Sequence, residues 1–259
     1  MKENIYIFYS DDHISFITNK IDASLHIHNF IQITVNIEDK FSVKIKNNVI
    51  NESGIIINSN VSHELFGKCG WQIYFLINPE SLFGEKIKRM YMKNKDFYII
   101  PENVTEAIRE LVEEKYIAID SKAKYSEFIS EIYSILSLKN YTVNHLLDER
   151  VDKVLKYIAN NNNLTEVSLE SLSKDVFLSE SRLSHLFKDN IGISISSYIL
   201  NYKVRKAFKL IFEGHSITTS ALEAGFYSSS HLTNVCKEKL GMIPSAIRKN
   251  SRYLQVNNY

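Results

Sequence analysis

The chain has 259 residues, of which 44% are hydrophobic and 24% are charged, and its formal net charge is +1. This length favours two domains, each large enough to bury a hydrophobic core. The charge is unevenly spread, because residues 150–259 carry 15 basic and 9 acidic side chains, whereas residues 1–149 carry 16 basic and 21 acidic ones. A basic carboxy-terminal half beside an acidic amino-terminal half is typical of a nucleic-acid-binding domain joined to a regulatory domain.

Several classes of protein are excluded by features that the sequence lacks. No apolar run is as long as a membrane span, and the first residues have no signal-peptide pattern. Cys69 and Cys236 are far apart and do not have the spacing of a metal or redox motif. There is no phosphate-binding loop, paired-carboxylate motif or Ser/His/Asp set. We therefore expect a cytoplasmic protein that is not an enzyme and has no membrane partner.

Residues 1–78 have the pattern of short β-strands. They are rich in β-branched and aromatic residues, and polar turns such as 38–40 separate the apolar runs. The expected strands are Ile5–Tyr9, Ile14–Ile17, Leu25–Ile37, Phe41–Ile45, Gly54–Ile57 and Trp71–Ile77. Six or more short strands with frequent turns predict a β-barrel or jelly roll.

The expected strand Leu25–Ile37 carries a polar face with histidines. Because side chains alternate along a strand, His26, His28 and Gln32 lie on the same side. With His63, which follows a later strand and turn, this set resembles the metal site of the cupin barrel, and three imidazoles are suitable ligands for Zn²⁺ or Fe²⁺. Gln32 stands where cupins have a glutamate, which favours the other interpretation, a metal-free pocket or a structural role.

We therefore expect no cofactor and no metal, and His26, His28 and His63 are the candidate ligands should a metal bind. The candidate effector-binding residues are His28, Gln32, His63, Trp71 and Tyr74.

Two helical stretches follow the expected strands. Apolar residues recur at helical spacing over 102–119 and more strongly over 122–138. The sequence predicts an antiparallel pair that either packs on the barrel or forms a homodimer contact, because core and interface stripes look alike. Residues 86–90 are expected to be basic surface, 139–144 a linker, and 145–159 the first helix of the second domain.

Residues 167–248 contain an internal repeat with two copies of one structural unit. The matched positions differ by a constant offset of 49, and they are Leu183 and Leu232, Phe187 and Cys236, Lys188 and Lys237, and Gly192 and Gly241. Each copy predicts a short helix, a turn and a second helix. This is the helix-turn-helix pattern, whose second helix enters the major groove of DNA.

The second helix of each copy has an outer face of small polar side chains. These residues are Ser181, Ser184 and His185 in the first copy, and Ser229, Ser230, Thr233 and Asn234 in the second. A long helix over 194–213 joins the copies. We expect it to hold the two faces at the spacing of successive major grooves, roughly 34 Å.

The second copy carries a long and specific pattern, SITTSALEAGFYSSSHL from Ser216 to Leu232, followed by Gly241-Met-Ile-Pro244. With the first copy, residues ~145–250 resemble the DNA-binding domain of the AraC/XylS family of bacterial transcription regulators. The resemblance implies that both outer faces contact bases and that Lys188 and Lys237 contact phosphates. We add Arg205 of the long helix to the expected DNA contacts. The resemblance to the AraC/XylS family also implies an amino-terminal, cupin-like barrel that senses an effector.

Three features depart from the family's pattern. Cys236 replaces the usual phenylalanine, Lys203 stands where an arginine is usual, and the first outer helix lacks the common aromatic or arginine. Because serine discriminates little between base edges, we expect weak readout by the first copy.

The sequence thus predicts an α+β protein. Residues 1–143 are expected to form a cupin-like β-barrel with a helical hairpin, and residues 144–259 an all-α double helix-turn-helix domain. The expected function is sequence-specific regulation of transcription in response to a small-molecule effector. The expected partners are double-stranded DNA and the effector, with RNA polymerase and a second copy of the chain as further candidates. Two alternatives are a metal-dependent cupin enzyme fused to a DNA-binding domain and a regulator that needs no ligand.

Overall fold

A computed structural model describes residues 5–10, 12–19, 22–28, 30–66, 70–79, 81–139, 148–161, 164, 167–191, 193–240, 243–245 and 251–255. The chain forms two compact units, one of Met1–Thr142 with Lys237–Tyr259 and the other of Val143–Cys236. Several residues singled out above lie outside the described ones, namely Cys69, Gly192, Gly241 and the expected linker after 139.

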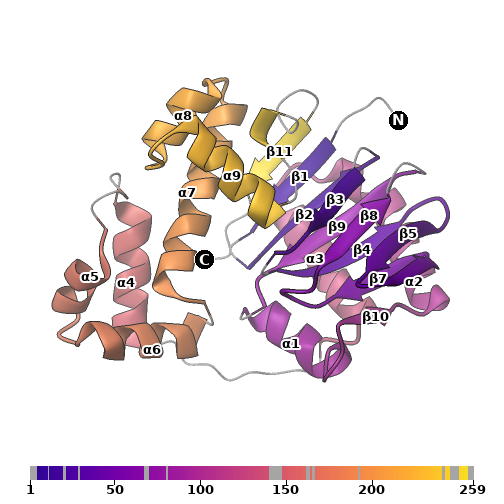
Figure 1. Ribbon diagram of the computed structural model, residues 1–259, viewed down its shortest axis with the longest axis horizontal. Coiled ribbons are helices and arrows are strands. Elements are labelled where there is room, and N and C mark those ends of the chain that lie inside the picture. Colours follow the sequence, from indigo (N-terminus) through magenta and orange to yellow (C-terminus); the bar gives the residue numbers. More distant parts are fainter. Residues whose placement is uncertain are drawn as a thin grey trace. The chain divides into compact units, whose positions relative to one another are not determined.

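The described strands of the first unit form a seven-stranded and a four-stranded sheet (Figure 1). The larger sheet has the order β10-β7-β4-β9-β2-β1-β11, and the smaller one β3-β8-β5-β6. The larger sheet contains β1 (Ile5–Tyr9), β2 (His13–Thr18), β4 (Ile31–Asn36), β7 (Gly54–Ile57), β9 (Gln72–Ile77), β10 (Phe97–Ile99) and β11 (Ser251–Gln255). The smaller sheet contains β3 (Asp22–His26), β5 (Phe41–Ile45), β6 (Asn48–Glu52) and β8 (His63–Phe66).

The β-rich fold is confirmed, and the described strands form two separate sheets that do not close into one barrel. The expected strand Leu25–Ile37 is also divided, since β3 ends at His26 and β4 begins at Ile31. Besides β11, three strands were not expected: β6, β8 and β10. They are five residues long or shorter, and β6 is exposed or half-buried along its whole length, so no apolar alternation marks it.

The two faces of the larger sheet differ in chemistry. Odd-numbered residues of β4 and β9, such as Ile33 and Phe75, belong to an apolar core that includes the helices following the sheet. Even-numbered residues such as Gln32 and Thr34 are buried on the other face. Figure 1 shows the strands of the smaller sheet beside β4 and β9. Because this polar face is buried, Gln32 is hydrogen-bonded within the protein to His28 and Thr34.

The helices of the first unit cover the apolar face. They are α1 (Leu82–Tyr91), α2 (Glu102–Lys115) with the short 3₁₀ turn η1 (Tyr116–Ala118), and α3 (Lys122–Ile135). The expected helix pair is confirmed, and Ser121 at the break caps α3 by accepting a hydrogen bond from the amide of Lys124 at 3.4 Å. Residues 86–90 lie in α1, where Arg89 is exposed and Lys86 and Lys88 are half-buried, while Ile87 of the same stretch is fully buried.

The second unit is helical. Its helices are α4 (Glu149–Asn160), α5 (Leu169–Asp175), α6 (Glu180–Ile191), α7 (Ile195–Phe212), α8 (Ile217–Glu223) and α9 (Ser229–Leu240), the last of which continues past Cys236. Serine side chains cap the starts of α5, α7 and α8, as their positions predict. The 18 residues of α7 make a rod of about 27 Å at 1.5 Å per residue.

The end of the chain contains a strand that sequence reasoning missed. Residues 251–255 form β11, which pairs in parallel with β1 in the register Ile5 with Ser251 and Tyr9 with Gln255. The compact units therefore differ at this end from the expected boundary, which assigned all of 144–259 to the second domain.

Candidate DNA-binding faces and a buried histidine cluster

The turns of the two helix-turn-helix units contain the same backbone hydrogen bond, but the second turn is one residue longer than the first. The amide of Leu178 donates to Ser173 O at 3.0 Å, and the amide of Phe226 donates to Ala221 O at 2.9 Å, so these positions are related by an offset of 48. The second helices are again related by 49. Their starts are capped by Ser179 and Ser228, which accept from the amides three residues further on at 3.3 and 3.1 Å.

The additional residue in the second turn is Tyr227. It is 88% exposed, and its ring stacks on His231 with 5.6 Å between ring centroids. The turn itself needs a left-handed residue, which is Gly225 (φ +87°) in the second copy and Phe177 (φ +55°) in the first. Phe177 is 93% exposed, so its ring contributes no core packing that compensates for this backbone conformation.

Most of the predicted DNA contacts lie on the surface. Ser181, His185, Lys188, Ser230, Asn234 and Lys237 are exposed, and Ser184, Ser229 and Thr233 are half-buried. The hydroxyl of Thr233 donates to the carbonyl of Ser229 at 2.8 Å, which orients it along the helix. The apolar residues of the same helices, such as Leu183 and Leu232, are fully buried. Each outer helix therefore has one buried and one polar face, as the repeat predicts.

Arg205 is placed differently from the other predicted contacts. It is only 4% exposed, and its guanidinium lies over the ring of Tyr202 at 4.7 Å. This position is typical of a cation–π contact within the domain. We therefore leave Arg205 out of the DNA-binding face proposed below.

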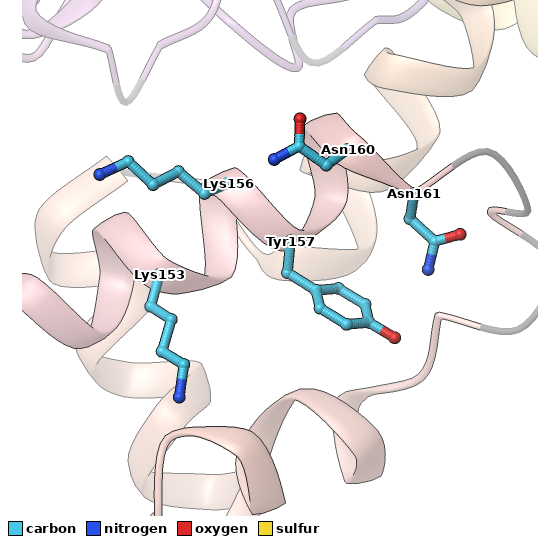
Figure 2. A pocket seen from close by; sticks show the side chains of 5 residues that line it. All are labelled: Lys153, Lys156, Tyr157, Asn160 and Asn161. Atoms are coloured by element: carbon cyan, nitrogen blue, oxygen red, sulfur yellow. The ribbon is translucent and has the colours of Figure 1, made fainter.

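A surface cavity of about 490 Å³ lies along α4 (Figure 2). It is lined by Lys153, Lys156, Tyr157, Asn160 and Asn161. The two lysines already have partners, because Lys153 donates to Asp175 O at 2.7 Å and Lys156 pairs with Asp152 at 2.6 Å. The cavity thus has basic residues at its border but lacks an unpaired cation.

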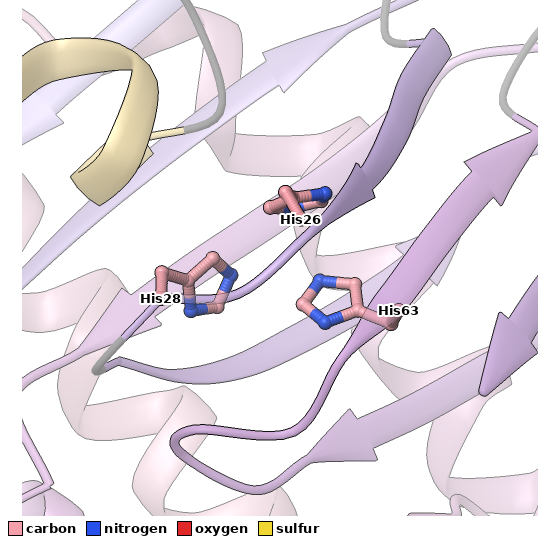
Figure 3. A group of neighbouring side chains, drawn as sticks. All are labelled: His26, His28 and His63. Atoms are coloured by element: carbon pink, nitrogen blue, oxygen red, sulfur yellow. The ribbon is translucent and has the colours of Figure 1, made fainter. Parts of the chain in front are cut away.

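Three histidines meet where the smaller sheet ends. His26, the last residue of β3, is the cross-strand partner of His63 at the start of β8, and His28 follows β3 by two residues. The ring centroids are 4.3 Å apart for His26 and His63, and 4.9 Å apart for His28 and His63. One nitrogen of each ring lies within 4.8 Å of the other two, and Figure 3 shows the rings grouped together.

Burial keeps two of these rings neutral. Desolvation, with a smaller contribution from the neighbouring histidines, lowers the pKa of His63 to about 3 and that of His28 to about 4. His63 Nδ1 is 2.9 Å from Val61 O, so this nitrogen carries the ring hydrogen and donates it. His63 Nε2 is buried and has no hydrogen-bond partner among the described residues.

The predicted effector residues are brought together only in part. His28 Nε2 lies 3.0 Å from Gln32 Oε1, and His63 is beside His28. Tyr74 pairs with Thr34 across the strands and shares the polar face of Gln32, and its hydroxyl donates to Gln72. Trp71 belongs to the apolar core on the helix side, so it is separated from the other four. Sequence reasoning missed Asn36 and Gln72, whose buried amide nitrogens lack partners among the described residues.

No helix in the described part of the chain is both long and apolar enough to cross a membrane.

Comparison with known proteins identifies the second unit. Residues 172–250 match the family model described as a helix-turn-helix domain. The chain is 32% identical over 107 residues to the bifunctional transcriptional activator/DNA repair enzyme Ada of Escherichia coli. The aligned region is 41% of this chain and 30% of that protein. The chain is 29% identical over 134 residues to the arabinose operon regulatory protein of Escherichia coli, covering 49% of this chain and 46% of the relative. The chain thus spans less than half the length of these relatives.

Two matches extend over nearly the whole chain. The probable transcriptional regulator LumQ of Photobacterium leiognathi is 25% identical over 243 residues, which is 89% of this chain and 95% of that protein. A crystal structure of apo ToxT from Vibrio cholerae superimposes with a TM-score of 0.51 at 13% identity, covering 95% of this chain and 96% of that one. These matches define a β-rich unit joined to a double helix-turn-helix domain. These comparisons support the resemblance to the AraC/XylS family that the sequence indicates.

Proposed function

We propose that the protein is a sequence-specific, double-stranded DNA-binding regulator of transcription. One observation supports this most directly: α6 and α9 each present exposed polar side chains opposite a buried apolar face, and α7 joins their helix-turn-helix units. Helices of this kind read base edges in the major groove, while lysines at their ends neutralise phosphates. Of the predicted contacts, Ser181, Ser184, His185, Lys188, Ser229, Ser230, Thr233, Asn234 and Lys237 make up the proposed DNA-binding faces.

We assign regulation by a small-molecule effector to the first unit. The polar face of β4 and β9 is buried against the smaller sheet, yet Asn36 Nδ2 and Gln72 Nε2 have no partner among the described residues. An unpaired buried amide costs about 1–3 kcal/mol, so a ligand with acceptor oxygens would be stabilised there. The proposed effector residues are His28, Gln32, His63 and Tyr74, together with Asn36 and Gln72.

The remaining expectations complete this proposal. The proposed activity is regulatory and not enzymatic. The polar side chains of the second unit are suited to binding DNA, and its proposed DNA-binding faces do not pair a nucleophile with a base. Residues 1–143 are assigned to regulation and 144–259 to DNA binding, in the cytoplasm. RNA polymerase and a second copy of the chain, through α2 and α3, are the proposed protein partners.

The test is selection of bound sequences from a random pool of duplex DNA by the purified full chain. A regulator of this kind should enrich a two-part motif whose halves are about 10 base pairs apart, one helical turn. Repeating the selection with candidate metabolites should change the amount of DNA retained without changing the motif. Recovery of unrelated sequences in every round would overturn the proposal, and indifference to all metabolites would favour a regulator that needs no ligand.

A further inference from the structure

We infer that His26, His28 and His63 form a binding site for one divalent transition-metal ion of the zinc type. The three rings come from two paired strands and the loop that follows one of them, so the backbone register of β3 and β8 sets their separation. Their ligand nitrogens already lie within 4.8 Å of one another. This inference concerns the first unit alone and does not depend on DNA binding by the second.

The position of the ring hydrogen on His63 leaves one of its nitrogens able to bind a metal ion. Because Nδ1–H donates to Val61 O at 2.9 Å, the lone pair of the ring is on Nε2. That atom is fully buried and has no partner among the described residues, which costs about 1–3 kcal/mol if nothing binds it. Metal-binding histidines commonly use this pattern, in which one nitrogen donates to a backbone carbonyl and the other binds the ion.

His28 offers a second lone pair. Both of its ring nitrogens face acceptor oxygens, Phe30 O at 3.2 Å and Gln32 Oε1 at 3.0 Å. A ring with one hydrogen can donate to only one of them, so the other nitrogen keeps a lone pair that faces an acceptor oxygen. The His28 ring must therefore turn for this lone pair to bind an ion. Gln32 is itself held by Thr34, to which its amide nitrogen donates at 2.9 Å. Gln32 would thus orient the His28 ring instead of replacing it as a ligand.

The geometry and the donor set select the ion. Zn²⁺ binds imidazole nitrogens at about 2.0–2.1 Å in a tetrahedral arrangement, and ligand atoms within 4.8 Å of one another reach it by movements of less than about 1 Å. Three neutral nitrogens without a carboxylate suit zinc better than calcium or magnesium, which prefer oxygen. Three protein ligands leave a fourth position for water or for an oxygen of a small molecule. The missing carboxylate, which favoured a metal-free pocket in the sequence, therefore does not prevent metal binding.

The experiment measures zinc bound by the full chain after treatment with a chelator, addition of zinc chloride alone, and removal of the excess. Elemental analysis should find about one zinc per chain in the wild type, and at least about tenfold less zinc in H26A and H63Q under the same conditions. H215A removes an exposed histidine from the loop between α7 and α8 and should bind zinc like the wild type. Circular dichroism checks that each variant is folded, and His26, which is only half-buried, provides the variant least disturbing to the core.

A second readout reports the ligands themselves. Co²⁺ in place of zinc should give the visible absorption of a four-coordinate ion in the wild type and in H215A, and lose it in H26A. Failure of the wild type to retain zinc would overturn the inference. Equal zinc retention by H26A, H63Q and the wild type would also overturn it, because the metal would then lie elsewhere.

Discussion

His13 Nε2 lies 2.7 Å from the hydroxyl oxygen of Tyr125, which joins β2 of the sheet to helix α3 across 112 residues of sequence. His13 Nδ1 is 2.6 Å from the carboxylate of Asp12, so Nδ1 carries the hydrogen and Nε2 accepts one from Tyr125. The hydroxyl of Ser15 lies 2.7 Å from the same tyrosine oxygen and 3.1 Å from that of Tyr116. Burial raises the pKa of Tyr125 well above its usual value, so its hydroxyl stays protonated and can donate.

The first prediction concerns this buried chain of hydrogen bonds. Tyr125→Phe keeps the ring but leaves His13 Nε2 without its donor, and it should lower the free energy of unfolding by about 1–3 kcal/mol. Urea unfolding followed by fluorescence measures this directly, because the single tryptophan, Trp71, lies in the core of the same unit. Tyr98→Phe, which alters a half-buried ring on β10, is the matched control and should change stability by less than about 0.5 kcal/mol. Equal stability of both variants would show that the network contributes little.

The second prediction compares the two turns. Phe177 and Gly225 occupy the same left-handed position, where a side chain costs about 1–2 kcal/mol. Gly225→Ala should therefore destabilise the second unit by about 1 kcal/mol, whereas Phe177→Gly should be neutral or stabilise it by up to about 1 kcal/mol. Thermal unfolding followed by circular dichroism is the measurement. A large loss of stability in Phe177→Gly would mean that this exposed ring has a packing role.

The third prediction separates base contacts from phosphate contacts. Asn234→Ala should weaken binding to the selected site by about 1–3 kcal/mol and relax preference at the bases that α9 contacts. Lys237→Ala should weaken binding to every sequence alike and lower the slope of log affinity against log salt concentration by about 0.9. Lys122→Ala removes an exposed lysine from α3 and should leave the slope unchanged. Equilibrium DNA-binding titrations at several salt concentrations are the measurement. An equal loss of sequence specificity in Asn234→Ala and Lys237→Ala would contradict this division of roles.

The fourth prediction concerns the first helix of the second unit. Asp148 begins α4, where its carboxylate accepts from the amide of Arg150 at 2.9 Å and pairs with the Arg150 guanidinium at 2.7 Å. Asp148→Ala should cost about 1 kcal/mol, because an unsatisfied amide replaces the cap. Asp148→Asn keeps an acceptor and should cost less. Amide hydrogen exchange of the first turn of α4 measures the local effect, and equal protection in both variants would argue against a capping role.

The repeated unit was well predicted because it depends on local rules. Apolar spacing, serine caps and the offset between copies fix α5 to α9 without knowledge of distant contacts. The offset of 49 is nonetheless interrupted in the turn, where Tyr227 is the additional residue. Arg205 was assigned to the surface because charge alone does not show that the Tyr202 ring lies beneath it.

The first unit was predicted less completely, because its strands are short and their pairing is non-local. Alternation placed His28 and Gln32 on one face, and they do meet, although the strand that was expected to carry both is broken between them. The proximity of His63 was expected only from the resemblance to the cupin metal site, since it depends on the pairing of β3 with β8 and not on a local pattern. Parity would have assigned Trp71 to the opposite face from Tyr74, and that signal was overlooked.

The parallel pairing of β11 with β1 has a practical consequence for anyone who shortens this protein. An amino-terminal fragment ending near residue 143 would leave the outer edge of β1 bare, and bare edges recruit strands from other molecules. Self-association of such a fragment would then be caused by the truncation, and it would not report on the interface between full-length copies. Affinity tags are better placed at the amino terminus, and oligomeric state is better measured on the intact chain.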